Sequence, residues 1–168
     1  MMRDMTMRFL MEAYAGESQA HMRYKNFAKK AKEEGLANIG RLFEAISFAE
    51  QVHASNHLNA ASGVKSTAEN LTTAVGGESF EVAEMYPTYM AVAELQQEKQ
   101  AAVSMHWAFE AEKIHKGWYE DAKKSADAKK DISIGTIQIC GNCGYTVEGE
   151  APDKCPVCGV AKGMFHAF

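Results

Sequence analysis

Four segments of the chain have apolar residues at alternating steps of three and four, the spacing that places side chains on one face of an α-helix. The first segment runs from Leu10 to Ala31 and the second from Ile39 to Ala60. The third runs from Leu71 to Leu95 and the fourth from Ala101 to Ala122. Because the segments are long and each apolar stripe is narrow, the pattern predicts a mainly α protein built around a four-helix bundle.

Turn residues set the expected ends of these helices. Gly35 is expected to end the first helix, and a loop is expected from Val64 to about Asn70 after the second. Pro87 lies inside the third segment, but the apolar stripe continues in phase across it, so we expect a kink rather than an end. The turn between the third and fourth segments contains no Gly or Pro, and helix length alone places it near Gln97.

Acidic and histidine side chains interrupt the four stripes at positions where aliphatic residues belong. Pairs spaced i, i+3 lie on one face of a helix, and an ionised carboxylate in an apolar core is costly without a cation. One Glu-x-x-His pair alone is usually solvated. Here acidic or histidine residues interrupt all four stripes, and this coincidence favours a metal site. The residues are Glu17, Glu50, His53, Glu78, Glu81, Glu112 and His115.

This donor set predicts two metal ions in the bundle. A Glu from each of two helices and a Glu-x-x-His from each of the other two is the ligand set of carboxylate-bridged di-iron bundles. Carboxylate oxygens with one imidazole per metal suit iron or manganese better than a closed zinc site. Glu33, Glu34, Glu94, Glu98 and Glu110 lie off the stripes and are expected to be solvated.

The last part of the chain has a different composition. Residues 131–168 contain all four cysteines, as the pairs Cys140/Cys143 and Cys155/Cys158, each with the spacing C-x-x-C. Two such pairs can close a tetrahedral site, and a segment this small needs metal binding to fold. The spacing does not choose between structural zinc and redox iron. We therefore predict two domains, residues 1–130 and residues 131–168.

Composition and charge narrow the class of protein. The 168 residues are 46% apolar and 24% charged, which is typical of a soluble globular protein. The net charge of −4 argues against a nucleic-acid surface over most of the molecule. No apolar run is long enough for a membrane span, and the first residues lack the apolar core of a secretory signal. A cytoplasmic protein is expected.

Five motifs, in order and spacing, resemble the rubrerythrin family over nearly the whole chain. They are Ala15–Ala20 with Arg23-Tyr24, Glu50–His53, Gly77–Pro87, Glu112–His115, and Cys140–Tyr145 with Cys155–Cys158. The resemblance implies a ferritin-like di-iron bundle followed by a rubredoxin-like domain with one iron on four cysteines, for which zinc can substitute. It implies an oxidoreductase that reduces hydrogen peroxide to water and protects against oxidative stress.

The resemblance also implies partners and residue roles. Electrons would come from rubredoxin or an NAD(P)H-dependent reductase through the rubredoxin-like iron, in a head-to-tail homodimer. Glu50 and Glu112 would bridge the irons, and His53 and Glu81 would exchange as ligands of one iron on reduction. The terminal ligands would be Glu17, Glu78 and His115. Tyr24 and Tyr86 would donate hydrogen bonds to ligand carboxylates, although simple packing explains both equally well.

Three other functions would each account for some of the same residues. A ferroxidase or iron-storage protein would need the di-iron residues but not the cysteine domain. A non-enzymatic zinc-ribbon protein would need the cysteines but not the carboxylates in the stripes. An oxygen reductase or oxygenase would use the same centre with a different substrate.

Overall fold

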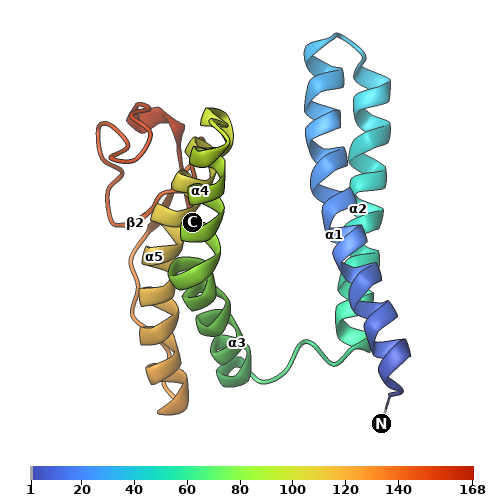
Figure 1. The fold of residues 1–168 in the computed structure, drawn as a ribbon, viewed down its shortest axis with the longest axis vertical. Helices are drawn as coiled ribbons and strands as arrows, with labels where there is room; N and C mark the ends of the chain where they lie inside the picture. Colours follow the sequence, from blue (N-terminus) through green and yellow to red (C-terminus); the bar gives the residue numbers. More distant parts are fainter. Residues whose placement is uncertain (1) are drawn as a thin grey trace. The chain divides into compact units, whose positions relative to one another are not determined.

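The computed structural model describes residues 2–168, and the chain divides into two compact units, one up to Lys65 and one from Ser66 onward. The first unit is a hairpin of two helices, α1 (Asp4–Glu33) and α2 (Ala37–Ala60), which pack along each other (Figure 1). Gly35 lies in the turn with a φ of +77°, a conformation that suits glycine, and α1 ends just before it, as predicted.

Small residues form the contact between α1 and α2. The residues of these helices that are buried are Ala28, Ala31, Gly40, Ser47 and Ala54. A polar link supplements this packing: the Ser47 hydroxyl donates to the backbone oxygen of His21 at 2.8 Å, and the ring Nδ1 of His21 lies 2.9 Å from the backbone oxygen of Ser47. His21 therefore joins the two helices.

The second unit begins with a long helical rod made of α3 (Thr67–Phe80), a π-helical turn η1 (Glu81–Met85) and α4 (Tyr86–Leu95). The expected loop to about Asn70 is wrong by four residues, because Ser66 caps α3. Its side chain accepts a hydrogen bond from the backbone of Glu69, whose side chain pairs back with the Ser66 backbone. This capping box supplies partners for backbone N–H groups that the first turn leaves unpaired.

The rod continues through Pro87, as predicted from the stripe. Pro87 lies in the first turn of α4, directly after the π-helical turn, where a missing backbone N–H does least harm. The irregularity thus falls in the π turn, which starts at the predicted ligand Glu81. The following turn lies at Gln96–Glu98, with Gln97 at φ +59°, and this confirms the predicted position.

Helix α5 (Lys99–Asp127) packs against α3 and α4, and the chain then enters a small sheet (Figure 1). The sheet is antiparallel with the order β2-β1-β3. Its strands are β1 (Ile137–Cys140), β2 (Thr146–Glu148) and β3 (Phe165–Ala167).

The structure confirms the predicted fold class: long helices followed by a small cysteine-knuckle domain. Where the domain boundary falls stays a prediction. Among the described helices, none combines the length and apolar character needed to cross a membrane.

Candidate metal centres

The helical residues predicted as ligands form two groups, one in each unit. In the first unit, one ligand atom each of Glu17, Glu50 and His53 lie within 4.8 Å of one another. Glu17 comes from α1 and the other two from α2, one turn apart. The ring Nδ1 of His53 lies 2.9 Å from Glu50 Oε2. The two glutamates are half-buried, and His53 is exposed.

The second group repeats this pattern in the second unit. Glu78 of α3 and Glu112 and His115 of α5 present ligand atoms within 4.8 Å of one another. Burial, followed by the charge of Glu112, raises the pKa of Glu81, which stands at the start of the π turn. The pKa of Glu78 is raised to about 8 by burial and by the neighbouring carboxyl groups of Glu112 and Glu81.

Tyr86 lies close to the same carboxylates. Burial raises its pKa, and the charges of Glu112, Glu81 and Glu78 raise it further, so the hydroxyl keeps its proton and can donate it in a hydrogen bond. Tyr24 instead packs against the Phe43 ring, with 6.1 Å between the ring centroids. The expected hydrogen bonds from both tyrosines to ligand carboxylates stay predictions.

The partners of His115 bear on the position of its ring proton. When the Thr146 hydroxyl, in strand β2, donates to the backbone oxygen of Gly144 at 3.0 Å, it accepts from the ring Nε2 of His115, 2.8 Å away. In a neutral ring with the proton on Nε2, Nδ1 is bare. That bare nitrogen faces Glu112 Oε2 at 2.7 Å. Two acceptors this close require a cation between them or a proton on Nδ1.

The four cysteines form the third group. Their sulfur atoms all lie within 4.8 Å of one another, with 3.7 Å between Cys140 and Cys158 and 3.5 Å between Cys143 and Cys155. These separations are far longer than a disulfide bond, and they approach the roughly 3.8 Å edge of a tetrahedron with metal–sulfur bonds of about 2.3 Å. The spacing therefore fits one tetrahedral metal ion.

Each cysteine pair is followed by a glycine with positive φ, Gly144 at +82° and Gly159 at +77°. These turns bring main-chain N–H groups to the sulfur atoms. Burial opposes ionisation of Cys158, but hydrogen bonds, first from the backbone of Val160 and then from Asn142, lower its pKa to about 6. Burial raises the pKa of Cys143, and the backbone hydrogen bond of Tyr145 acts in the opposite direction.

The residues of all three groups fit metal ions. Glu78 Oε2 is buried without a hydrogen-bond partner, which a cation would supply. Each helical group pairs carboxylates with one histidine, the hard donor set that suits iron or manganese. Four converging thiols that are not joined in disulfides suit one ion of iron or zinc.

The cysteine domain packs on α5 near the second group. The Trp107 side chain contacts the buried cluster of Cys140, Cys143 and Cys155, and β2 lies against α5. The contact of Thr146 with His115 belongs to the same interface. Thr146 and Trp107 could not be identified from the sequence, because each contacts residues that are distant along the chain and no local motif indicates such a contact.

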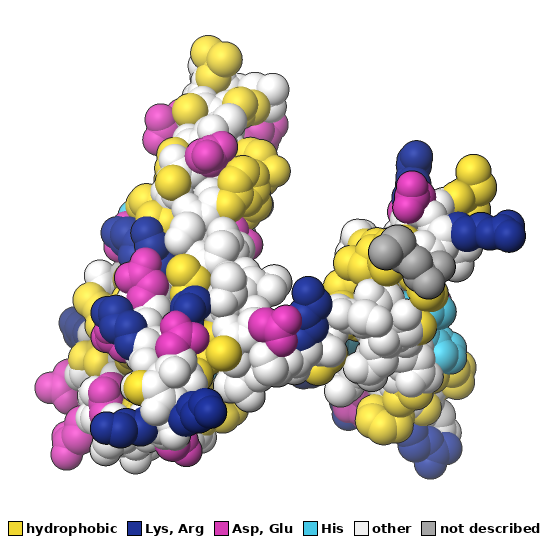
Figure 2. Space-filling view, turned by 90° about the horizontal axis from the view of Figure 1, so that it is seen from below, with side chains coloured by type: hydrophobic (Ala, Val, Ile, Leu, Met, Phe, Trp, Pro, Cys, Tyr) yellow, Lys and Arg dark blue, Asp and Glu magenta, His cyan; other side chains and the backbone are white. Residues whose placement is uncertain are grey.

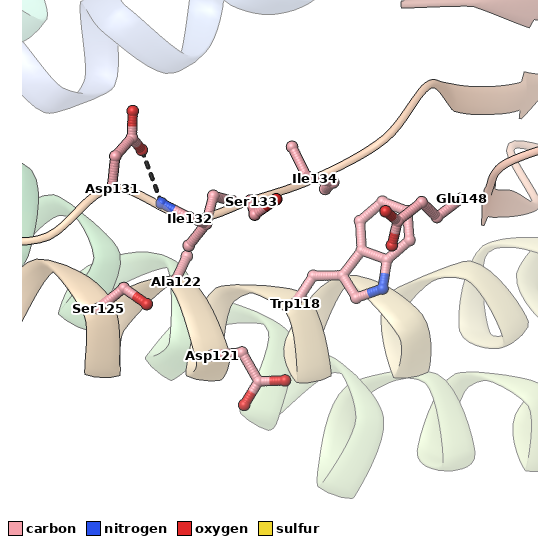
Figure 3. Close-up of a pocket in the computed structure, with 9 residues that line it drawn as sticks. All are labelled: Trp118, Asp121, Ala122, Ser125, Asp131, Ile132, Ser133, Ile134 and Glu148. Carbon is pink, nitrogen blue, oxygen red and sulfur yellow. Dashed lines mark hydrogen bonds between the residues drawn. The ribbon is translucent and has the colours of Figure 1, made fainter.

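A separate cavity of about 350 Å³ lies between α5 and the segment that leads to β1 (Figure 3). Trp118 and Glu148 line it, together with Asp131, whose carboxylate accepts a hydrogen bond from the Ile132 backbone. The Glu148 carboxylate accepts from the Gly135 backbone at 2.6 Å. These carboxylates have backbone partners and form no metal-ligand group among the described residues, so the cavity adds nothing to the metal centres.

Comparisons with known proteins agree with these groups. The rubrerythrin family model matches residues 8–123, and the model of the rubrerythrin rubredoxin-like domain matches residues 138–166. Rubrerythrin-2 of Clostridium acetobutylicum is 44% identical, with 98% of this chain and 97% of the relative aligned. Nigerythrin of Nitratidesulfovibrio vulgaris is 33% identical, with 97% and 86% aligned.

A solved structure of fully reduced, all-ferrous nigerythrin is also similar. It has a TM-score of 0.56 and 32% identity, and the match covers 97% of this chain and 86% of that one. Together with the geometry, the comparisons support a rubrerythrin di-iron site and a rubredoxin-like domain that contains the cysteine group.

Proposed function

The chain belongs to the rubrerythrin family, and we propose that it reduces hydrogen peroxide to water at the di-iron site. The contact between His115 and Thr146 supports this proposal most directly, because it joins a predicted iron ligand to the domain that holds the four cysteines. Peroxide reduction consumes two electrons, so a di-iron peroxidase needs an electron supply. An iron-storage protein has no use for such a link.

Three hydrogen bonds in series form the link. His115 Nε2 donates to Thr146, the Thr146 hydroxyl donates to the backbone oxygen of Gly144, and the Gly144 N–H donates to the backbone oxygen of Cys140 at 2.9 Å. We infer that electrons reach the site along this route. When bound, two ferrous ions supply one electron each, which with two protons converts hydrogen peroxide into two water molecules.

The chain's own side chains hold and orient the site. Glu50 and Glu112 would hold both irons, and Glu17, Glu78 and His115 would each hold one. His53 and Glu81 would be the pair that exchanges as ligands of one iron. The exposure of His53 supports this role, since an exposed ring has room to turn. A neutral Tyr86 hydroxyl next to the carboxylates is available to orient one of them by a hydrogen bond.

The partners that follow from this function are rubredoxin or an NAD(P)H-dependent reductase as electron donor and a second copy of the chain in a homodimer. The hydrogen-bonded route described above lies within one chain, whereas passage of electrons between subunits, expected from the family resemblance, stays a prediction. The cytoplasmic location also stays a prediction.

A titration of the purified protein tests the function. We expect three irons per chain, a red oxidised form from thiolate-to-iron charge transfer, and bleaching on reduction. One equivalent of hydrogen peroxide should oxidise the two bundle irons of the anaerobically reduced protein. Colourless protein that holds only zinc after iron-replete expression would rule out the redox function. Uptake of added ferrous iron far beyond three per chain would favour storage, and faster oxidation by oxygen than by peroxide would favour an oxygen reductase.

A further inference from the structure

His21 and Ser47 form a reciprocal link between α1 and α2. The Ser47 hydroxyl donates to the backbone oxygen of His21 at 2.8 Å, and the His21 ring Nδ1 lies 2.9 Å from the backbone oxygen of Ser47. A carbonyl oxygen can only accept a hydrogen bond, so Nδ1 carries a proton and donates it. Each side chain therefore bonds to the main chain of the other residue, and the His21–Ser47 link joins the two backbones.

A serine is an unusual residue at this position. Ser47 is 4% exposed, in a contact whose other buried residues are alanine and glycine. Burying a hydroxyl costs free energy unless it is hydrogen-bonded, and alanine would fill nearly the same space without that cost. Among residues 2–168, the buried polar residues are Ser47 and Thr146, and each of them contacts a histidine. The partner of Thr146 is the predicted iron ligand His115, whereas Ser47 contacts His21, which is not a predicted ligand.

The His21–Ser47 link belongs to a series of paired positions that runs along both helices. Each step of three or four residues back along α1 corresponds to a similar step forward along α2, as expected for an antiparallel pair. The pairs are Ala28 with Gly40, Tyr24 with Phe43, His21 with Ser47, and Glu17 with Glu50. The link therefore lies one helical turn from a pair of predicted iron ligands.

The other contacts of the series resist sliding of the helices less strongly. Small residues bring the main chains close together, since a Cβ added to Gly40 would lie 3.2 Å from the backbone oxygen of Ala28. Within α1 and α2, no apolar side chain larger than alanine is buried, and hydrophobic side chains reach the surface of both units (Figure 2). Interlocking of large side chains thus contributes little to the register of this pair. A hydrogen bond, in contrast, depends on both distance and direction.

The position of α1 along α2 sets the distance between two predicted ligands. A shift by the rise of one residue is about 1.5 Å. Such a shift would misalign both hydrogen bonds of the His21–Ser47 link, and it would move Glu17 by the same amount relative to Glu50. Distances from a metal ion to its ligands tolerate deviations of only about 0.2 Å. A hairpin in the wrong register would therefore bind iron poorly even when both helices are folded.

We propose that His21 and Ser47 are positioning residues for the iron site, which fix the register of α1 on α2 and thereby hold Glu17 opposite Glu50 and His53. The inference rests on the proposed di-iron site for its ligands. The link itself is independent of the reaction that the site carries out.

The second hairpin lacks a link of this kind. Val82 and Phe109 occupy the positions that match His21 and Ser47, four residues after one ligand glutamate and three before the other. Neither side chain can form a hydrogen bond. In that unit the Thr146 hydroxyl contacts a ligand from outside the hairpin. The two ligand groups are thus positioned by different contacts, and loss of the His21–Ser47 link should affect the first group.

Substitution of His21 tests the positioning role through iron binding rather than through peroxide reduction. In the full-length protein, His21→Leu keeps a branched side chain but cannot donate to Ser47. We expect the affinity of the bundle for ferrous iron, measured anaerobically by competition with a chelator, to fall about 10- to 100-fold, the range typical for loss of a residue that orients a metal ligand. His21→Asn places an amide N–H near the position of Nδ1 and should restore most of the affinity. Helix content and cysteine-bound iron serve as folding controls.

Ala28→Gly is the matched control on the same helix contact. It removes a buried methyl group and weakens the helix, but it leaves the His21–Ser47 link intact. We expect a lower thermal stability with nearly unchanged affinity for iron. If His21→Leu and Ala28→Gly lose iron affinity equally for an equal loss of stability, His21 acts only through folding, and the positioning role is overturned.

Ser47→Ala provides a second variant, because it removes one oxygen atom from the link and keeps the His21 ring. We expect a smaller decrease in iron affinity in the same direction. Affinity at the wild-type level in both Ser47→Ala and His21→Leu would overturn the proposal and leave the proposed function standing. A wild-type protein that binds two bundle irons but does not reduce peroxide would contradict the function, while the affinities of the variants would still decide the positioning role.

The proton on His21 can be observed by nuclear magnetic resonance. In isotope-labelled full-length protein loaded with zinc, the ring nitrogen resonances distinguish a proton on Nδ1 from a proton on Nε2. We expect His21 to carry a proton on Nδ1 that exchanges slowly with water, and we expect faster exchange in Ser47→Ala. A ring protonated on Nε2 alone would show that the link does not form, and it would overturn the proposal.

Discussion

The ring Nε2 of His115 lies 2.8 Å from the Thr146 hydroxyl, and this contact links a predicted iron ligand to a strand of the cysteine domain. The Thr146 residue is only 2% exposed, so its hydroxyl has no access to water as an alternative partner. When Nε2 carries the proton and donates it to Thr146, Nδ1 is free for a metal. One threonine thus controls the ligand and connects the two domains.

Replacing Thr146 by valine should weaken this connection. Valine has nearly the same shape but cannot accept from His115 or donate to Gly144. Loss of such a contact to a metal ligand typically costs about 10- to 100-fold in metal affinity or activity. We expect slower reoxidation of the cysteine-bound iron by peroxide, measured by the return of the red colour. Thr146→Ser keeps the hydroxyl and should retain most of the wild-type rate. Equal rates in the two variants would contradict the role of the hydrogen bond.

Removal of Glu50 should damage iron loading more than removal of Glu81. Glu50 is assigned as a bridge, so Glu50→Ala should release both bundle irons. Glu81→Ala leaves His53 as a substitute ligand for the same iron, so close to two irons should remain. Metal analysis of both variants, with the cysteine-bound iron as internal control, measures the difference. Two bundle irons in Glu50→Ala and none in Glu81→Ala would reverse the assigned roles.

Zinc in place of the cysteine-bound iron should separate electron supply from peroxide chemistry. Zinc keeps the cysteine domain folded but has no redox chemistry. Turnover with NADH and a reductase should be lost, whereas the chemically reduced bundle should still be oxidised by peroxide at a rate near that of the wild type. Deleting residues 131–168 is a less clean test, because it also removes Thr146. Reductase-driven turnover that persists with zinc would contradict electron delivery by the cysteine domain.

The metal-free protein should lose stability as the pH rises from about 5 to 8. The pKa of Glu78 is raised from 4.5 to about 8 by burial and the neighbouring carboxyl groups of Glu112 and Glu81. In this range the folded chain binds more protons than the unfolded chain, so the free energy of unfolding falls with increasing pH. Thermal unfolding at several pH values measures the slope. The glutamine in Glu78→Gln cannot ionise, so this variant should show a smaller dependence of stability on pH. An equal dependence in both proteins would show that another group is responsible.

The helices could be predicted from the sequence because their periodicity is local. The apolar stripe also predicted correctly that the helix continues through Pro87. The start of α3 was missed although its signal was present, since Ser66 followed by Glu69 is a capping box. Thr146 could not be found, because 31 residues separate it from His115 and only the packing of β2 on α5 brings them together.

The residues of the candidate site were predicted from the sequence, but which of them lie together was not. The spacing identifies which carboxylates and histidines share a helix face. It does not determine that Glu17 groups with Glu50 and His53, nor that Glu78 groups with Glu112 and His115. That grouping depends on which helices pack together, and in this chain it follows from two short turns that make two hairpins.

The hydrogen bonds to the cysteine sulfur atoms have a consequence for how this protein can evolve. The backbone groups of Tyr145, Val157 and Val160 make most of these bonds, and the Asn142 side chain adds one to Cys158, so the main chain contributes most of this part of the control over the reduction potential. Substitutions at these positions can accumulate in descendants with little change in potential. Substitutions at Gly144 and Gly159 should change the potential, because a side chain there would disturb the turns that orient the N–H groups.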